Sequence, residues 1–161
     1  QNFDAAEWFA SEVMPHIIRR DPAFTFKVIG LIDDAACKRL SSYENVEVLG
    51  RVDSVRDALV DSFAAVCPLR FGAGVQTKVL EYMAFGVPVV MSSMGNEGID
   101  APSDVAVVVD TPAEMADSLI WLSENHEECR TMASRARLFV KEQYDGEVVS
   151  RPVLEKIIEL V

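Results

Sequence analysis

The first pattern along the chain is a set of apolar residues at helical intervals. They fall near one face of a helix and are Trp8, Phe9, Val13, Ile17 and Ile18. Asp4 is placed to cap this helix, with Glu7 three residues later as in a capping box. We therefore predict a helix over residues 4–20. Pro15 should bend or split it, because proline removes a helical hydrogen bond.

Short, nearly continuous apolar runs alternate with helical segments along the rest of the chain. Strands are predicted over residues 24–30, 46–50, 64–69, 87–93 and 105–110. Helices are predicted over residues 34–40, 54–63, 75–85, 111–123, 125–143 and 149–160, and residues 94–100 are expected to form a loop. Ser54 is expected to cap the second of these helices, Gly86 to follow the end of the third, and Thr111 with Glu114 to form a capping box at the start of the fourth. Continuous apolar strands between helices are typical of an α/β fold. The pattern predicts a Rossmann-like parallel sheet with helices on both faces.

The loops at one edge of such a sheet are the natural place for a ligand. In open α/β sheets, ligands bind outside the carboxyl ends of the strands. The predicted strands place four loops at that edge, over residues 31–33, 50–53, 69–74 and 92–99.

Composition narrows the classes of function. The 161 residues suffice for one domain, half of them are hydrophobic, and the formal net charge is −11. A nucleic-acid binder usually carries a basic surface, and no basic cluster is present, so nucleic acid is not an expected partner. No apolar run approaches the roughly 18 residues of a membrane helix, and no signal peptide is recognisable. We expect a cytoplasmic protein.

Cysteine and histidine give no sign of a metal site or a catalytic thiol. Cys37, Cys67 and Cys129 are odd in number and widely spaced, which fits neither a disulfide framework nor a zinc site. His16 and His126 are isolated. We expect reduced thiols and no bound metal.

A glycine-rich loop follows the strand predicted over residues 64–69. Gly72 and Gly74 would let the backbone approach a ligand closely, just before the first N–H groups of a helix. Such a place can hold an anion without a net positive charge. The loop matches neither the Walker pattern nor the dinucleotide fingerprint, because no Lys follows a Gly directly and Thr77 replaces the third Gly. Taken alone, the loop can also be a simple tight turn.

Lys78 and Glu81 share one face of the helix predicted after this loop. Glu81 lies seven residues beyond Gly74, which is roughly 10 Å along a helix axis. That separation suits the diphosphate and the ribose of one nucleotide, and a carboxylate can accept hydrogen bonds from two ribose hydroxyls. The alternative is a surface ion pair between Lys78 and Glu81, worth only tenths of a kcal/mol.

Taken together, residues 67–99 resemble the donor-site signature of family-4 glycosyltransferases, which are retaining enzymes of the GT-B fold. The matching positions are Pro68, Gly72, Gly74, Glu81, Ala84, the segment 86–90, Glu97 and Gly98. Residues 4–30 and 45–59 also resemble segments of the carboxyl-terminal domain of these enzymes. The likeness covers nearly the whole chain.

The resemblance implies a role for each matching position. Backbone N–H groups at Gly72, Ala73, Gly74 and Val75 would bind the donor diphosphate and its sugar. Glu81 would hold the ribose hydroxyls.

Other positions are implied to complete the donor site. Arg51 and Val52 would lie beside the nucleobase, and Glu97 with Gly98 would close the pocket. Lys78 would support the phosphates or orient Glu81.

The chain departs from the family pattern at one position. Many members carry two Glu residues seven positions apart, and the first of them contacts the transferred sugar. Here the second is Glu81, and Ala73 stands at the place of the first. A subgroup with a glycine-rich turn and a Lys at the position of Lys78 is similar to this sequence.

The resemblance also implies a function for the whole protein. It would transfer a hexosyl group from a UDP- or GDP-sugar to a glycan or lipid-linked acceptor in polysaccharide biosynthesis, with no metal or other cofactor. Any membrane contact would be peripheral, at the inner face. Residues 1–161 would form one nucleotide-sugar-binding domain, the C-terminal half of a GT-B fold. Its first strand and the N-terminal acceptor domain would be absent, so we expect this fragment alone to be inactive.

Two other classes of function stay open at this point. The replacement of Glu by Ala73 is compatible with a non-catalytic nucleotide-sugar-binding module or a degenerate transferase. A response-regulator-like domain would need an acidic cluster and a Lys at a strand end. Asp33 and Asp34 supply part of the cluster, but no such Lys follows the strand predicted over residues 105–110.

Overall fold

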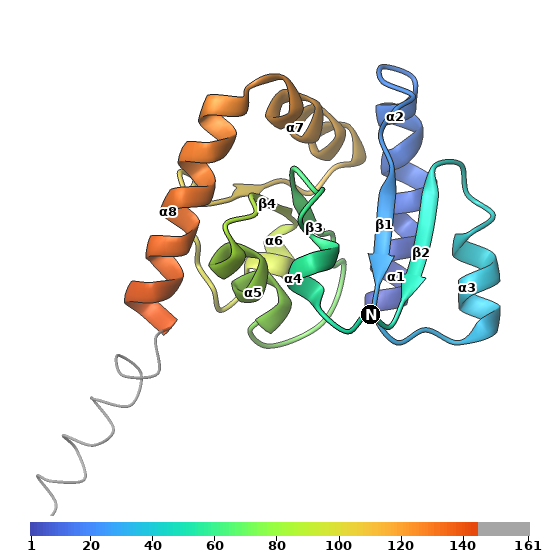
Figure 1. Cartoon of the computed structure of the whole chain (residues 1–161), viewed down its shortest axis with the longest axis horizontal. Helices are drawn as coiled ribbons and strands as arrows, with labels where there is room; N and C mark the ends of the chain where they lie inside the picture. Colours follow the sequence, from blue (N-terminus) through green and yellow to red (C-terminus); the bar gives the residue numbers. More distant parts are fainter. Residues whose placement is uncertain (145–161) are drawn as a thin grey trace, which may run out of the picture.

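The computed structural model describes residues 1–144, so the helix predicted over 149–160 lies outside the described residues. Within them the strands are β1 (Phe26–Ile29), β2 (Val46–Gly50), β3 (Ala65–Cys67), β4 (Val89–Met91) and β5 (Val107–Val108). Every strand pairing is parallel. The strands form a pair, β1–β2, and a triplet in the order β3–β4–β5 (Figure 1). The α/β class, with parallel strands, is confirmed, but the predicted single sheet is divided in two.

The helices separate the strands along the chain, as predicted. Their bounds are α1 (Asn2–Trp8), a π-helical turn η1 (Phe9–Val13), α2 (Met14–Ile18), α3 (Asp34–Leu40), α4 (Val55–Ala58), α5 (Thr77–Phe85), α6 (Ser93–Asn96), α7 (Pro112–Glu124) and α8 (His126–Tyr144). Within residues 1–144, none of them combines the length and hydrophobicity needed to cross a bilayer.

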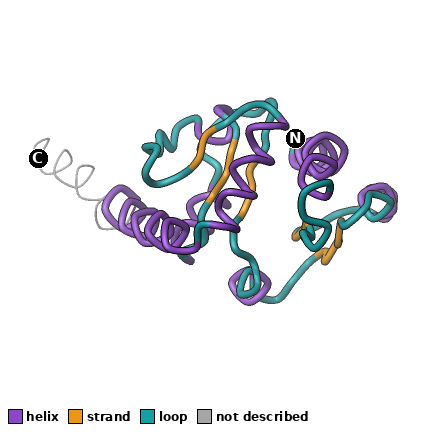
Figure 2. Tube along the Cα trace, turned by 90° about the horizontal axis from the view of Figure 1, so that it is seen from above, coloured by secondary structure: helices purple, strands orange, loops and turns teal. Residues whose placement is uncertain are grey.

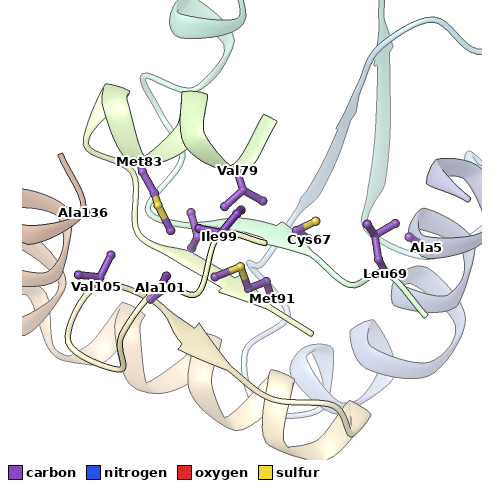
Figure 3. Close-up of a cluster of buried hydrophobic side chains, with 12 residues drawn as sticks. Ala5, Cys67, Leu69, Val79, Met83, Met91, Ile99, Ala101, Val105 and Ala136 are labelled. Carbon is purple, nitrogen blue, oxygen red and sulfur yellow. The ribbon is translucent and has the colours of Figure 1, made fainter. Parts of the chain in front are cut away.

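Strand β4 shows that helices cover both faces of the triplet. Val89 and Met91 belong to a buried cluster with residues of α5 and α8, drawn in part in Figure 3. Val90, which points to the opposite face, belongs to a second cluster with η1, α2 and α7. All three side chains are fully buried. Because side chains alternate along a strand, β4 is the middle of a three-layer sandwich.

The first helical segment differs from its prediction in two ways. Asp4 does not cap it, because the helix already begins at Asn2 and the Asp4 carboxylate binds Arg70. The segment is also not interrupted at Pro15; instead η1 widens the helix just before α2. A proline cannot donate a helical hydrogen bond, and a π-helical turn is one way in which a helix adapts to that.

Two predicted segments differ from the structure in their bounds, while the predicted caps of α4, α5 and α7 are observed. The helix predicted over residues 54–63 shortens to α4, although Ser54 caps it as expected, its side chain accepting from the Asp57 N–H. The loop predicted over residues 94–100 begins with part of a short helix, α6, whose cap is Ser92. The capping box of α7 is confirmed, with Thr111 and Glu114 bonded reciprocally. Gly86 ends α5 in the left-handed conformation, as predicted.

Gly95 offers a test of the packing of α6. A Cβ added there would lie 2.6 Å from the Cys67 carbonyl oxygen and 3.2 Å from the Met91 Cβ. We predict that Gly95→Ala lowers the free energy of unfolding by about 1–3 kcal/mol, the usual cost of overpacking. Urea unfolding measures this change. Ala35→Ser, an exposed change on α3, is the control. An unchanged midpoint for Gly95→Ala would contradict the packing described.

Candidate functional site

The segment between β3 and α5 forms the centre of the candidate site. Gly74 has a φ of +81°, in the left-handed region, and a Cβ there would point into open space. The buried Gln76 side chain folds back, its Nε2 donating to the Gly74 carbonyl oxygen at 3.0 Å. This loop leads directly into α5. The first N–H groups of that helix therefore face the carboxyl edge of β3.

The start of α5 lacks the side-chain cap that α3, α4, α6 and α7 have. Side-chain oxygens of Asp33, Ser54, Ser92 and Thr111 cap α3, α4, α6 and α7. No side chain caps α5, since Gln76 at the cap position makes no such bond. Uncapped N–H groups and the positive end of the helix dipole favour an anion.

The loop after β4 lies against this segment. A Cβ added to Gly98, which has a φ of +76°, would lie 3.2 Å from Val75 Cγ2. The buried Ser92 ties the same regions together, donating from its hydroxyl to the Leu69 carbonyl oxygen and accepting from the Gly95 N–H at 3.0 Å. The structure thus brings Gly98 and Val75, both of them predicted site residues, together.

Lys78 and Glu81 do not form the surface ion pair that sequence left open. The Lys78 ammonium donates to the Asn2 side-chain carbonyl at 2.7 Å, across 76 positions in the chain. Glu81 is exposed and has no ion-pair partner among the described residues. Lys78 is half-buried, and both residues lie on a different face of α5 from the buried Val79 and Met83.

Arg70 and Asp4 are site-edge residues that sequence reasoning missed. Arg70 donates from Nε and Nη2 to the two Asp4 carboxylate oxygens, at 3.0 and 2.5 Å. This fork lowers the pKa of Asp4, mainly through the Arg70 hydrogen bond, and raises that of Arg70. Arg70 directly follows a predicted strand, and that position could have indicated a site residue. Its partner Asp4 was instead predicted to cap the first helix.

Four other predicted site residues lie in loops at the carboxyl ends of the strands but do not contact Lys78 or Glu81 through a hydrogen bond or an ion pair. Arg51 and Val52 directly follow β2, whose last residue accepts from the Gly30 N–H at 2.8 Å. Ala73 and Glu97 are exposed. Among the described residues, no hydrogen bond or ion pair links any of these four to Lys78 or Glu81.

Titratable groups beneath the site are poorly suited to nucleophilic chemistry. Burial raises the pKa of the Cys67 thiol, although the Lys78 charge acts in the opposite direction. Burial also raises the pKa of Tyr82. A thiol with a raised pKa is protonated at neutral pH and is a weak nucleophile. Residues 1–144 contain no group of three or more His, Cys, Asp or Glu side chains that could hold a metal ion.

A comparison with protein families decides what kind of domain this is. The family model described as "Glycosyl transferases group 1" matches residues 1–125. The chain belongs to the group 1 glycosyltransferases. A curated relative from Klebsiella pneumoniae, called an uncharacterized 44.6 kDa protein in the cps region, is 25% identical over 165 residues.

Solved glycosyltransferase structures share the fold. TarM of S. aureus superimposes with a TM-score of 0.74 at 22% identity, over 98% of this chain. HepE of Anabaena, solved in complex with UDP, gives 0.77 at 16% identity over 91% of the chain. The C-terminal domain of LpcC from Francisella tularensis gives 0.70 at 16% identity over 90%. The fold is therefore that of the C-terminal domain of GT-B glycosyltransferases.

This group 1 domain is only part of the length of its relatives. It spans 42% of the Klebsiella relative, 31% of TarM and 44% of HepE. It covers 81% of the LpcC C-terminal domain.

The Asp4–Arg70 fork gives a prediction about pH. Because the folded-state pKa of Asp4 lies below its usual 3.8, the stabilisation is present above that value and is lost as pH falls through the lowered pKa. We predict that Arg70→Gln raises the pKa of Asp4 towards 3.8, measured by NMR titration of its carboxyl carbon. Arg20→Gln, which breaks the exposed pair with Asp117, is the control. An Asp4 pKa unaffected by Arg70→Gln would show that the fork does not form.

Proposed function

We propose that this chain is the donor-binding domain of a retaining, family-4-type glycosyltransferase. The observation that carries the proposal is the uncapped start of α5 behind the glycine loop, at the carboxyl edge of β3. The donor diphosphate would lie there, bonded to backbone N–H groups of residues 72–78. This mode of binding is compatible with a chain of formal net charge −11, because it needs only local dipoles.

Lys78 would supply the single strong positive charge of this subsite. Its partner in the structure, Asn2, is a neutral amide and leaves the ammonium charge uncompensated. Arg70 lies nearby in sequence, but Asp4 neutralises it. A phosphate oxygen can replace the Asn2 carbonyl and gain a charge-assisted hydrogen bond.

Glu81 is placed to accept from the ribose. It lies three residues beyond Lys78, about 4.5 Å further along the helix axis and away from the glycine loop. It is exposed, and no cation among residues 1–144 forms an ion pair with it. Both carboxylate oxygens are therefore open to the two adjacent ribose hydroxyls.

The nucleobase would lie further along the carboxyl edge, beside Arg51 and Val52 after β2. HepE has been solved with UDP and with UDP-glucose, and TarM with UDP, which favours a uridine donor over a guanosine one. Glu97 and Gly98 would cover the sugar from the loop after β4. Gly98 already lies against Val75.

In the proposed reaction, fixed N–H dipoles stabilise the charge that grows on the leaving nucleoside diphosphate. Such preorganised donors commonly supply a large share of transition-state stabilisation. Ala73 offers only its backbone to the transferred hexose. We propose no metal in this step, because the α5 start and Lys78 supply the needed positive potential.

The acceptor would be bound by a further domain of the whole protein, so the 161-residue chain would bind donor without transferring sugar. The location of the Klebsiella relative in a cps region supports a glycan or lipid-linked acceptor in polysaccharide biosynthesis. We propose a cytoplasmic protein with peripheral contact at the inner membrane face. A donor-binding module without catalysis is the second candidate, favoured by Ala73.

Lys78 gives the first test of this site. We predict that Lys78→Gln weakens UDP binding by roughly tenfold to a hundredfold, the worth of a hydrogen bond to a charged group. Uridine, which lacks the diphosphate, should bind the variant as it binds the wild type. NMR titration of both ligands measures this, with Lys141→Gln on α8 as the control. Equal losses for UDP and uridine would contradict a phosphate role.

Glu81 gives the complementary test. Glu81→Ala should weaken UDP and uridine by a similar factor, roughly tenfold, because both ligands carry the ribose. Glu128→Ala removes a carboxylate from α8 and should leave both affinities unchanged. Calorimetry with UDP, GDP and ADP sugars then ranks the nucleobases. Wild-type affinity in Glu81→Ala would exclude the ribose role.

A further inference from the structure

Tyr144, the last residue of α8, reaches the loop that follows β4 and α6. Its hydroxyl donates to the Gly98 carbonyl oxygen at 3.2 Å and to the Ile99 carbonyl oxygen at 3.3 Å, across 46 and 45 positions in the chain. Figure 1 and Figure 2 show α8 on the side of the strand triplet that faces away from the β1–β2 pair. The contact therefore connects a helix outside the candidate site to a loop that belongs to it.

Helix α8 holds the Tyr144 ring in place. The helix packs along α5, and its Ala136, Phe139 and Val140 join or contact the buried cluster that contains Met83 of α5. The ring centroids of Tyr144 and Phe139 lie 6.0 Å apart, with the ring planes at 56°. This is an ordinary geometry for an aromatic pair. The packing of the ring thus directs the hydroxyl to the loop.

This loop has an unusual backbone. Gly98 has a φ of +76° and Asp100 a φ of +52°, which is uncommon for a residue with a Cβ. The Asn96 carbonyl oxygen accepts from the N–H groups of Ile99 and Asp100, each at 3.0 Å, and the Asn96 side chain accepts from the Ala101 N–H at 2.9 Å. These bonds satisfy N–H groups of the loop but leave two of its carbonyls to another partner.

Tyr144 is the partner of those two carbonyls. Among the described residues, no other hydrogen bond reaches the Gly98 or Ile99 carbonyl oxygen. Burial raises the pKa of the Tyr144 phenol, and the charge of Asp100 acts in the same direction. The hydroxyl is therefore protonated at neutral pH and able to donate. Removing it would take away the one donor that the described residues offer to both carbonyls.

The same loop lies against the segment that begins α5. A Cβ added to Gly98 would lie only 3.2 Å from Val75 Cγ2. Val75 directly precedes Gln76, the residue at the cap position of α5. Two contacts therefore lead from α8 to the proposed donor site: Tyr144 to the Gly98 carbonyl, and Gly98 to Val75.

We propose that Tyr144 is a positioning residue for the sugar of the donor. By binding the Gly98 and Ile99 carbonyls, its hydroxyl keeps their loop against Val75, where Glu97 and Gly98 cover the sugar. The inference rests on the proposed function, in which that loop covers the sugar of the bound nucleotide.

The effect of Tyr144 is confined to the sugar, because the diphosphate has other partners. In the proposed site these are backbone N–H groups near Gly74 and the Lys78 ammonium, and Tyr144 forms no hydrogen bond with Lys78. A loop that has lost the Tyr144 bond must be ordered by the ligand itself, and such ordering weakens binding. UDP-glucose requires the ordered loop, whereas UDP, which lacks the hexose, does not.

Tyr144→Phe tests this role, because it removes the hydroxyl and keeps the ring that packs on Phe139. We expect UDP-glucose to bind this variant roughly threefold to tenfold more weakly, in line with the loss of one hydrogen bond, and UDP to bind it as it binds the wild type. Calorimetry with both ligands measures the difference. Tyr43→Phe removes a hydroxyl that bonds to Glu7 of α1 and is the control, with both affinities unchanged.

A measurement without ligand checks the contact itself. The carbonyl carbon resonances of Gly98 and Ile99 should shift in the NMR spectrum of Tyr144→Phe and stay in place in that of Tyr43→Phe. Unchanged resonances would overturn the inference by showing that the bond does not form.

The calorimetry separates a failure of this inference from a failure of the proposed function. If the wild type binds UDP-glucose and Tyr144→Phe binds it equally well, the inference is wrong and the proposed function stands. An equal loss for UDP and UDP-glucose would also contradict the inference, because Tyr144 would then support the fold rather than the sugar. A wild-type chain that binds neither ligand would refute the proposed function and the inference with it.

Discussion

The rest of the structure depends on the contact between the first helical segment and the strand triplet. At its start, Asp4 binds Arg70, just beyond β3, and Asn2 binds Lys78 in the first turn of α5. Further on, η1 and α2 pack their apolar faces against α7 and Val90. These contacts hold the β1–β2 pair beside the triplet and bring both carboxyl edges to one side of the molecule, where the candidate site lies.

The candidate site depends on the missing side-chain cap of α5 as much as on the charge of Lys78. In four other helices a cap side chain accepts from one of the first N–H groups, and in α5 none does. A helix start left open at the ligand-binding edge of an α/β sheet is unfavourable without an anion or water. In this group 1 glycosyltransferase domain, Lys78 adds the charge that the acidic chain otherwise lacks there.

Sequence predicted the local elements well because their signals are local. Three of these signals depend only on neighbours within a few residues: the Ser54 helix cap, the capping box at Thr111 and the left-handed conformation of Gly86. The misassigned residue was Asp4, whose partner Arg70 lies 66 positions away. The division of the sheet was equally hidden, because apolar runs reveal that strands are buried but not which strands pair. The role of Glu81 was predicted from its spacing to Gly74 and from resemblance, and the roles of the site residues stay predictions.

The central claim is that the start of α5 binds the diphosphate of a nucleotide sugar. A crystal structure of the chain with bound UDP-glucose tests it most directly. The account predicts phosphate oxygens about 3 Å from backbone N–H groups near Gly74 and from the Lys78 ammonium, with the ribose hydroxyls at Glu81. A diphosphate bound away from α5, with the helix start still open, would contradict it.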